Sequence, residues 1–241
     1  MKTHKTVVVI SIDALHPDSI KMAKPENILR VMEKGISTLD GTSVAPPKTL
    51  INHTAMALGK MPEESGYTVN AWKPGMPKAE GESIFSLAKK SGLKTFYVYS
   101  KELLGFLATE DVDEQYFAGM DSLSEGDRIV DETKEDYFLF LHISGLEFTG
   151  MEHGWLSDEY ITKFQEIDAG LAGVIKTIME KTDTTLVITS DHSGHEKIHG
   201  SDHPEDFKMP LIVYSDMADF SEYNNKSYKT VELKSLLSKI I

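Results

Sequence analysis

The sequence predicts an α/β fold with a mostly parallel central sheet that is covered by helices on both faces. Short runs of β-branched and apolar residues, such as Thr6–Ile12, have the composition of strands buried on both sides. These runs alternate with segments of helical periodicity, and this alternation is typical of βαβ units and parallel sheets. We expect one domain over residues 1–241, without a large inserted cap domain.

The individual elements follow from local patterns. Asp158–Glu180 is the clearest helix, because apolar residues recur at three- and four-residue steps and Ser157 suits the N-cap. Pro62–Gly81 is expected to be irregular. The other expected strands are Lys94–Tyr99, Tyr137–Ile143, Thr184–Thr189 and Pro210–Tyr214, and the other expected helices are Pro17–Lys34, Leu50–Leu58, Glu82–Lys90 and Val231–Ile240.

Composition narrows the classes of function. The net charge of −13 argues against a nucleic-acid surface, which requires arrays of Lys and Arg. It says less about small phosphates, because a bound metal ion can reverse the local charge of an acidic pocket. The chain has no cysteine, so any metal must be held by His, Asp or Glu. No stretch has the roughly 20 apolar residues of a membrane span, and no signal peptide is evident. We therefore expect a cytoplasmic protein without a membrane contact; the pattern carries no indication of an oligomeric state.

Two acidic positions come directly after predicted strands. Asp13 follows the first strand, and Asp191 with His192 follows the strand Thr184–Thr189. Ligands of open α/β sheets bind outside the carboxyl ends of the strands, so these side chains are expected in one pocket. Two carboxylates and an imidazole suit Zn²⁺ or another divalent ion. The alternative for each Asp is a helix cap without chemistry.

Two further segments are unusual for packing alone. Four of the nine histidines lie between residues 192 and 203, in a polar loop that contains glycine. Thr49 precedes a predicted helix, where free backbone N–H groups and the helix dipole favour an anion. Its hydroxyl could attack phosphorus if a metal lowered its pKa, although a threonine N-cap is the simpler alternative for this segment alone.

These segments together resemble the type I phosphodiesterase/nucleotide pyrophosphatase group of the alkaline phosphatase superfamily. Ile10-Ser11-Ile12-Asp13-Ala14-Leu15 and Thr189-Ser190-Asp191-His192 match the group's motifs. The block from Pro47 to Gly66 resembles its TxPNHxxxxTGxxPxxHG pattern, except that Ser65 replaces the last histidine. Gly154–Tyr160 and Gly200–Asp206 also resemble segments of the group. The matches run along nearly the whole chain in the expected order.

The resemblance implies an alkaline phosphatase-like fold and a first metal site formed by Asp13, Thr49, Asp191 and His192. Thr49 would be the nucleophile that forms a covalent phospho-threonine. Asn52 would donate a hydrogen bond to a non-bridging oxygen of the phosphoryl group.

The second metal site implied by the resemblance is where the sequence departs from the group. Glu147 stands for an aspartate ligand, and Met151 stands for a histidine, although a thioether is a poor ligand for hard or borderline ions. His199 is the best match for the C-terminal ligand, with His203 as the alternative. His153 could substitute for the missing histidine if its loop bends differently.

Two divalent ions are therefore expected, with zinc first and manganese or magnesium as alternatives. The expected function is hydrolysis of phosphodiesters or nucleotide pyrophosphates. Two alternatives stay open: a phosphoryl-transferring mutase of the same superfamily, and a non-catalytic binding protein that retains one metal. Trp72 lies in a segment that the group uses near the substrate, and packing is an equal interpretation for it.

Overall fold

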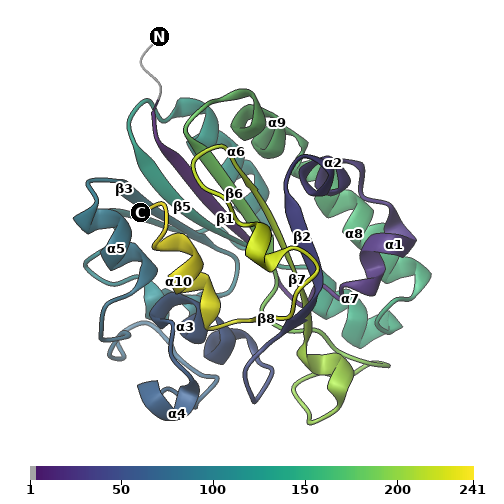
Figure 1. Ribbon diagram of the computed structural model, residues 1–241. Coiled ribbons are helices and arrows are strands. Elements are labelled where there is room, and N and C mark those ends of the chain that lie inside the picture. The colour runs from purple at the N-terminus through teal and green to yellow at the C-terminus, as the bar shows by residue number, and fades with distance from the viewer. Residues whose placement is uncertain (1–3) are drawn as a thin grey trace.

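An eight-stranded mixed sheet forms the centre of the molecule, in the order β4-β3-β5-β1-β6-β7-β2-β8. The structure, a computed structural model, describes residues 4–241. Helices lie on both faces of the sheet (Figure 1). The predicted α/β class with a mostly parallel sheet is confirmed.

The middle of the sheet is parallel and inaccessible to water. β1 (Thr6–Ile12) pairs in parallel with β5 (Tyr137–Ile143) and with β6 (Thr184–Thr189), and every residue of the three strands is buried. β3 (Lys94–Tyr99) and β4 (Glu114–Phe117) extend the sheet in parallel beside β5. Burial on both faces explains why these strands are apolar without alternation.

The other side of the sheet contains antiparallel pairs. β7 (Lys208–Ser215) runs antiparallel to β6 and to β2 (Ile36–Thr42), and β8 (Tyr228–Lys229) adds a short parallel pair with β2. The sequence analysis did not identify β2, because Ile36–Thr42 is largely polar and contains Gly41. β4 and β8 were missed as well, since strands this short carry little pattern.

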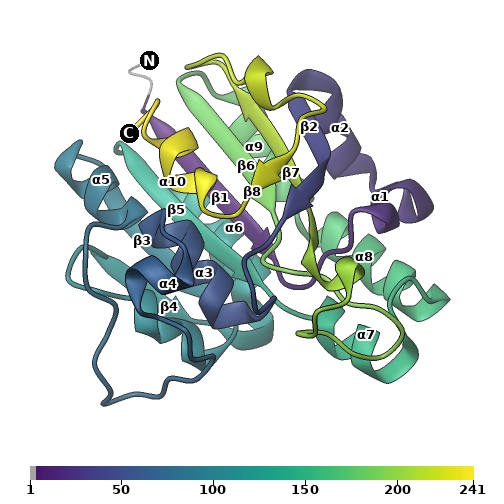
Figure 2. The same cartoon turned by 60° about the horizontal axis from the view of Figure 1, so that its bottom comes forward.

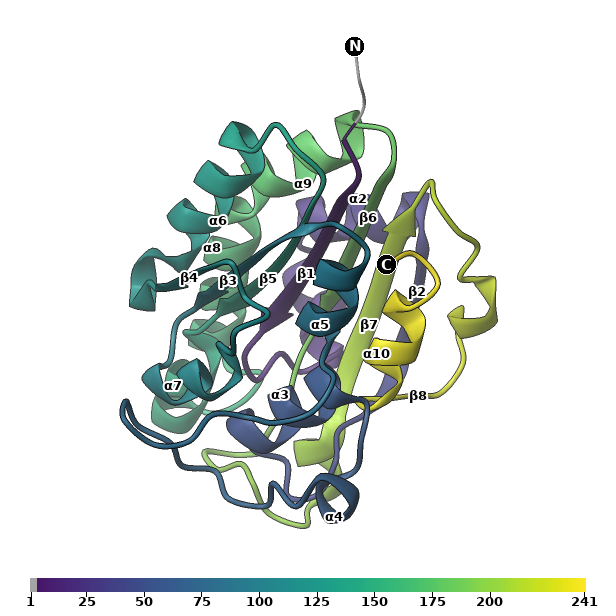
Figure 3. The same ribbon diagram turned by 90° about the vertical axis from the view of Figure 1, so that its left-hand side faces the viewer.

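Helices lie on the two sides of the sheet (Figure 3), and each face of the sheet has its own apolar core. Val8, Ile10 and Ile12 of β1 point into one core, and Val7 and Val9 point into the other. The first core is covered by α1 (Asp18–Ala23), α2 (Glu26–Lys34), α6 (Ser122–Glu132), α8 (Asp158–Gly170) and α9 (Ala172–Glu180). The second is covered by α3 (Thr49–Leu58), α5 (Ile84–Lys90) and α10 (Glu232–Leu237).

Two segments that were predicted as single helices are each divided. Residues 17–34 form α1 and α2, separated at Lys24 and Pro25, where Lys24 adopts a left-handed conformation (φ 48°). A proline disfavours helical backbone in the residue before it, which explains the break. Residues 158–180 form α8 and α9, which meet at Leu171.

The carboxyl ends of β1, β5 and β6 meet at one edge of the sheet, which Figure 2 brings forward. α3, α4 (Pro62–Ser65) and α7 (Leu146–His153) lie at this edge. Short 3₁₀ helices complete the chain at Glu102–Leu107, Gly119–Asp121, Pro204–Phe207 and Ser221–Tyr223. Within residues 4–241, no helix combines the length and the apolar character of a membrane span.

The buried Asp168 of α8 caps the N-terminus of α2 and gives a test of the fold. Its carboxylate accepts hydrogen bonds from the backbone N–H groups of Asn27 (3.1 Å) and Ile28 (2.9 Å) and from the Asn27 amide (3.1 Å). We predict that Asp168→Ala lowers the free energy of unfolding by about 2–3 kcal/mol, because buried donors lose a charged acceptor.

Urea unfolding followed by circular dichroism measures this change. Glu166→Ala, on the same helix, is the matched control, because Glu166 forms only an exposed ion pair with Lys163. The control should stay within about 0.5 kcal/mol of the wild type. Equal losses in both variants would contradict the capping role.

Candidate metal centre and nucleophile

Asp13 and Asp191 lie side by side because the strands that precede them are neighbours. Ser11 of β1 pairs with Thr189 of β6, and each aspartate comes two residues later. Both side chains and that of His192 are fully buried. The parallel register therefore brings together the three residues that the sequence analysis selected at strand ends, and their potential ligand atoms form one compact group.

Hydrogen bonds from the turn after β1 hold Asp191 and its neighbour Ser190 in place. Ala14 adopts a left-handed conformation (φ 61°), and its N–H donates to Oδ1 of Asp191 at 3.1 Å. The N–H of Leu15 donates to Oγ of Ser190 at 2.9 Å, and the Tyr160 hydroxyl donates to the Ala14 carbonyl at 2.6 Å. A strained residue at this point is held by its surroundings, as is common at functional sites. Asp191 keeps Oδ2 without a protein partner among the described residues.

The imidazole of His192 presents one nitrogen to the two aspartates. Its Nδ1 lies 2.9 Å from the Ser193 carbonyl, which can only accept, so Nδ1 carries the proton. Nε2 therefore has a free lone pair, and it lies 3.4 Å from Oδ2 of Asp191 and 3.6 Å from Oδ1 of Asp13. The hydrogen bond from Nδ1 to the Ser193 carbonyl orients the ring, as is usual for a metal-binding histidine.

Thr49 begins α3 and directs its hydroxyl toward the same point. Its Oγ1 lies 3.4 Å from Nε2 of His192, and the side chain is buried. His53 stabilises the first turn, since its Nδ1 donates to the Thr49 carbonyl at 2.7 Å while its Nε2 accepts from the Ser11 hydroxyl at 2.9 Å. His53 thus has a structural role.

The four residues of the predicted first metal site fit a divalent ion. Donor atoms around a tetrahedral zinc ion lie about 3.3 Å from one another, given bonds of about 2.0 Å. The separations of Nε2 of His192 from oxygens of Thr49, Asp13 and Asp191 are 3.4, 3.6 and 3.4 Å. Oδ1 of Asp13 and Oδ2 of Asp191 are buried without a hydrogen-bond partner among residues 4–241. Buried carboxylate oxygens require a cation or donor, so this donor set suits a metal.

The side-chain oxygen and nitrogen of Asn52 both form hydrogen bonds with the loop before Thr49. Its Oδ1 accepts from the N–H of Val44 at 2.7 Å, and its amide group donates to the carbonyls of Val44, Pro46 and Lys48 at 3.2–3.3 Å. The predicted donation from Asn52 to a phosphoryl oxygen competes with these bonds. The geometry gives Asn52 the role of positioning the segment that carries Thr49.

Asn70 lies beside Thr49, the predicted nucleophile, in a position that was not expected from the sequence. Its Oδ1 accepts from the N–H of Leu50 at 2.8 Å, directly after Thr49. Its amide nitrogen has no hydrogen-bond partner within the described part of the chain. The amide is therefore fixed beside the N-terminus of α3 with its donors free. The signal in the sequence was its position in the irregular segment after Gly66, two residues before Trp72.

Trp72 itself packs on the protein. Its indole nitrogen donates to the carbonyl of Pro77 at 2.9 Å, and its ring lies against Gly105, where a Cβ atom would meet it. The packing interpretation therefore accounts for Trp72.

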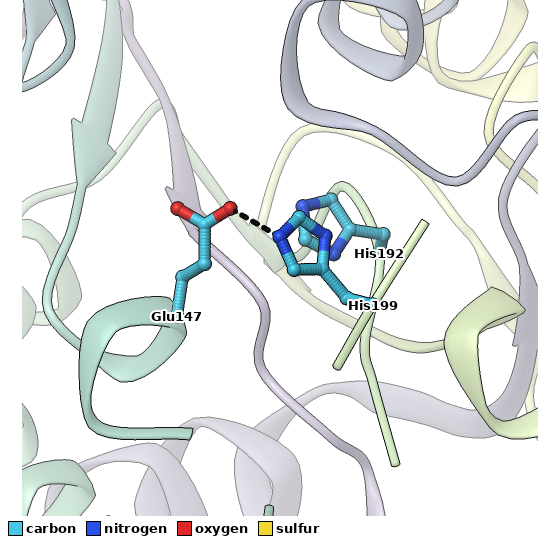
Figure 4. A group of neighbouring side chains, drawn as sticks. All are labelled: Glu147, His192 and His199. Atoms are coloured by element: carbon cyan, nitrogen blue, oxygen red, sulfur yellow. Dashed lines mark ion pairs between the residues drawn. The ribbon is translucent and has the colours of Figure 1, made fainter. Parts of the chain in front are cut away.

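Glu147 and His199 meet beside this centre, as the resemblance implied (Figure 4). Oε1 of Glu147 lies 2.9 Å from Nε2 of His199, and the ring of His199 stacks on that of His192 with centroids 4.7 Å apart. Nδ1 of His199 has no partner among the described residues. Glu147 comes from the first turn of α7, and His199 comes from the histidine-rich loop after β6.

The other residues considered for the second metal site lie elsewhere. His153 is half-exposed and faces Glu152 and Glu159. His203 is exposed, stacks on His195 with centroids 3.8 Å apart, and accepts from the N–H of Glu205. Met151 lies one turn after Glu147 with 40% of its surface exposed. The structure thus brings His199 to the centre and leaves His153 and His203 outside it.

Lys101 is the principal residue that the sequence analysis missed. Its Nζ lies 2.5 Å from Oδ2 of Asp13, donates to Oγ1 of Thr49 at 3.1 Å, and forms a short ion pair with Oε2 of Glu147. Its side chain is nearly buried, with 12% exposed. Lys101 stands two residues after the end of β3, just as Asp191 stands two residues after the end of β6. The rule that selected strand ends would therefore have found it.

The charges of the centre depend on one another. Burial raises the pKa of Asp13 well above its usual range, and the neighbouring Asp191 and Glu147 raise it further against the opposing effect of Lys101. Burial would also raise the pKa of Asp191, but His192, His53 and Lys101 outweigh it and keep this carboxyl ionised. Burial lowers the pKa of His192 despite Asp191, so the imidazole is neutral and able to bind a metal.

Glu147 and Lys101 also affect each other. Burial would raise the pKa of Glu147, but the hydrogen bond from His199 and the charge of Lys101 bring it down to about 2. For Lys101 burial opposes the charge, and the carboxylates of Asp13 and Glu147 outweigh that cost and raise its pKa. The two side chains form an ionised pair at neutral pH.

A family model described as type I phosphodiesterase/nucleotide pyrophosphatase matches residues 7–211. The chain belongs to this family. It is thereby a member of the alkaline phosphatase superfamily of phosphoesterases and phosphotransferases. The match covers every residue of the centre described above. It ends before the C-terminal helix α10.

Several solved structures share the fold of this chain. Murine ectonucleotide pyrophosphatase/phosphodiesterase 5, in an inactive form in complex with AMP, superposes with a TM-score of 0.78 at 13% identity, covering 98% of this chain and 95% of that one. The C-terminal periplasmic domain of EcEptC from Escherichia coli, in complex with zinc, gives 0.70 at 14% identity, covering 100% and 83%. At these identities the likeness establishes the fold.

Curated relatives are much longer proteins. GPI ethanolamine phosphate transferase 1 of Gibberella zeae is 25% identical over 216 residues, which are 77% of this chain and 21% of that protein. The mouse protein of the same name is 22% identical over 164 residues, covering 63% and 17%. The chain therefore spans about a fifth of the length of these relatives.

Metal binding at the first site should be visible as thermal stabilisation. With zinc at about 100 times its Kd we predict a gain of about 2.7 kcal/mol, or roughly 5–10 °C in Tm. Asp191→Asn should abolish most of the shift, since it removes a charged ligand. Differential scanning calorimetry with and without zinc measures the effect.

His153→Ala and His203→Ala are the controls, because both were candidate ligands and both lie outside the centre. Each should retain the zinc shift of the wild type. A shift that survives Asp191→Asn and disappears in His203→Ala would place the stabilising ion in the histidine loop instead.

Proposed function

We propose that the chain is a metal-dependent phosphoric-ester hydrolase that uses Thr49 as its nucleophile. Phosphodiesters and nucleotide pyrophosphates are the proposed substrate class. The observation that carries the proposal is the position of the Thr49 hydroxyl, which lies between Nε2 of His192 and Nζ of Lys101 at the N-terminus of α3. A threonine that served only as a helix cap would not require these two partners.

The surroundings of Thr49 suit a phosphoryl group. The N-terminus of α3 offers the positive end of a helix dipole over ten residues. Lys101 supplies a positive charge, and the fixed amide of Asn70 supplies hydrogen-bond donors beside Leu50. These groups surround the hydroxyl from different elements, so they can contact an anion that approaches it.

A divalent ion at Asp13, Asp191 and His192 would lower the pKa of the Thr49 hydroxyl and neutralise charge on the phosphoryl group. Zinc is the first candidate, supported by the zinc complex of the EcEptC domain, with manganese and magnesium as alternatives. A second ion at Glu147 and His199, expected from the resemblance, would have to share its surroundings with Lys101.

The reaction has two transfers. In the first, Oγ1 of Thr49 forms a bond to phosphorus, the bond from phosphorus to the leaving oxygen breaks, and the hydroxyl proton ends on the leaving group. In the second, a water oxygen attacks the phospho-threonine, the bond to Oγ1 breaks, and Thr49 regains a proton. Lys101 stays within reach of Oγ1 in both steps and stabilises it as attacking and as leaving oxygen.

Transfer to an alcohol is the second candidate function. The curated relatives are named GPI ethanolamine phosphate transferases, and transfer differs from hydrolysis only in the acceptor of the second step. An alcohol hydroxyl would replace water in the attack on phospho-threonine. The ratio of released phosphate product to alcohol adduct separates the two functions.

Thr49→Val tests the nucleophile directly. We predict that turnover of bis(p-nitrophenyl) phosphate by the zinc-loaded protein falls by about 10³- to 10⁶-fold, because the attacking oxygen is removed while the shape is kept. Thr49→Ser should retain measurable turnover. Release of p-nitrophenol, measured by absorbance, gives the rates.

The matched control is Thr54→Val on the same helix, since the Thr54 hydroxyl donates only to the Leu50 carbonyl. It should keep turnover within a few-fold of the wild type. Wild-type protein that binds zinc but turns over neither this diester nor nucleotide substrates would favour the non-catalytic alternative. Turnover that is unchanged in Thr49→Val would refute the proposed mechanism.

A further inference from the structure

The ammonium group of Lys101 lies among three oxygen atoms of the centre. An ammonium has three hydrogens and no acceptor. Three oxygens surround Nζ: Oδ2 of Asp13 at 2.5 Å, Oγ1 of Thr49 at 3.1 Å, and Oε2 of Glu147. Each comes from a different element of the fold. The ammonium is therefore surrounded by oxygen atoms, as a bound metal cation would be.

The residues around it do not fit a second divalent ion of their own. Glu147 and His199 are the two ligands that this position can claim for itself. The third member of the group, His192, has a single free lone pair at Nε2, which faces Asp13 and Asp191. Met151 offers only a thioether, and much of it is exposed. Zinc sites have three or four protein ligands, so two are too few.

The charges of the carboxylates and of Lys101 also argue against a second divalent ion. Once a divalent ion binds Asp13 and Asp191 as carboxylates, these two and Glu147 supply three negative charges, and Lys101 supplies one positive charge. One divalent ion neutralises the remainder. A second ion beside the ammonium would put cations next to each other in a buried site, where repulsion is weakly screened.

We propose that the ammonium of Lys101 takes the place of the second divalent ion, so that the centre works with one metal held by Asp13, Asp191 and His192. This inference rests on the proposed function. Lys101 contacts the nucleophile and stabilises the charge that develops on Oγ1 of Thr49. Glu147 and His199 are then positioning residues: Oε1 of Glu147 accepts from His199, and Oε2 fixes the ammonium.

The test is the number of zinc ions bound per wild-type chain, measured without substrate. The protein is dialysed against excess zinc and then against buffer with a weak chelator, and zinc is determined by elemental analysis. Two groups outside the centre could also hold zinc: His195 with His203 and Asp206, and His16 with Asp18 and Glu205. Zinc that the wild type binds and the double variant His203→Ala/Asp18→Ala does not is therefore subtracted from the count. One zinc per chain is expected. Two tightly bound zinc ions overturn the proposal.

Variants of Lys101 add a second readout. Lys101→Met should keep the single zinc and lower kcat by about 10²- to 10³-fold, the range for loss of one donor at a developing oxyanion. Lys101→Arg should recover part of the loss, since it restores the charge. Lys94→Met is the matched control from the opposite end of β3, where Lys94 pairs with Glu114 at the surface, and it should behave as wild type.

Unchanged turnover in folded Lys101→Met with one zinc overturns the proposal. If this variant does not fold, the zinc count of the wild type decides the question alone. Failure of the proposed function has a different signature, because Thr49→Val would then leave turnover unchanged whatever the zinc count.

Discussion

Three carboxylates converge at the carboxyl edge of the sheet in a place from which water is almost excluded. Asp13 and Asp191 are fully buried, and Glu147 is 7% exposed. Carboxylates at such a point repel one another and lose their hydration, so the folded state requires cations among them. The ammonium of Lys101 provides one, and the unsatisfied oxygens of Asp13 and Asp191 indicate where another is needed. The rest of the site is arranged around this requirement.

The sheet is what forces the convergence. β1, β5 and β6 run in parallel with consecutive register, so that the residues after them emerge at one edge. β3 lies beside β5 and delivers Lys101 to the same edge. Antiparallel neighbours would send these side chains to opposite ends of the sheet. The parallel core thus determines the electrostatics of the centre, and the long apolar strands provide the stability against which buried charge is tolerated.

The sequence could predict this core and one half of the site because both leave a local signature. Thr6–Ile12, Lys94–Tyr99, Tyr137–Ile143 and Thr184–Thr189 are strands with the predicted bounds. Asp13 and Asp191 were found because each stands directly after one of them. β2 and β4 were not found, since their residues are only partly buried and their pattern is weak. Their pairing is set by neighbours far along the chain, which no local period records.

The role of Asn52 illustrates what a motif leaves out. The resemblance implies that it donates to a phosphoryl oxygen, which stays a prediction, and the structure shows that its amide also bonds to carbonyls of the preceding loop. Asn70 occupies the free place beside Leu50 although it is 20 residues away. A resemblance transfers residue types along the chain, but hydrogen-bond partners follow from how irregular segments fold back. Such segments have no periodicity from which their course could be derived.

The departures from the family pattern become consistent with one another once Lys101 is included. Replacement of an expected histidine by Met151 removes a metal ligand, which alone would leave Glu147 as an unpaired buried charge. The longer side chain of glutamate reaches both His199 and the ammonium, and the ammonium also reaches Oγ1 of Thr49. The positive charge of a lysine is covalently attached to the chain. Dilution or a chelator therefore cannot remove the cation that Lys101 supplies in the proposed one-metal centre. It also stays available to the nucleophile in every step, because its charge is independent of metal supply. In the proposed one-metal centre, Lys101 therefore supplies the positive charge at the position where Met151 cannot bind an ion.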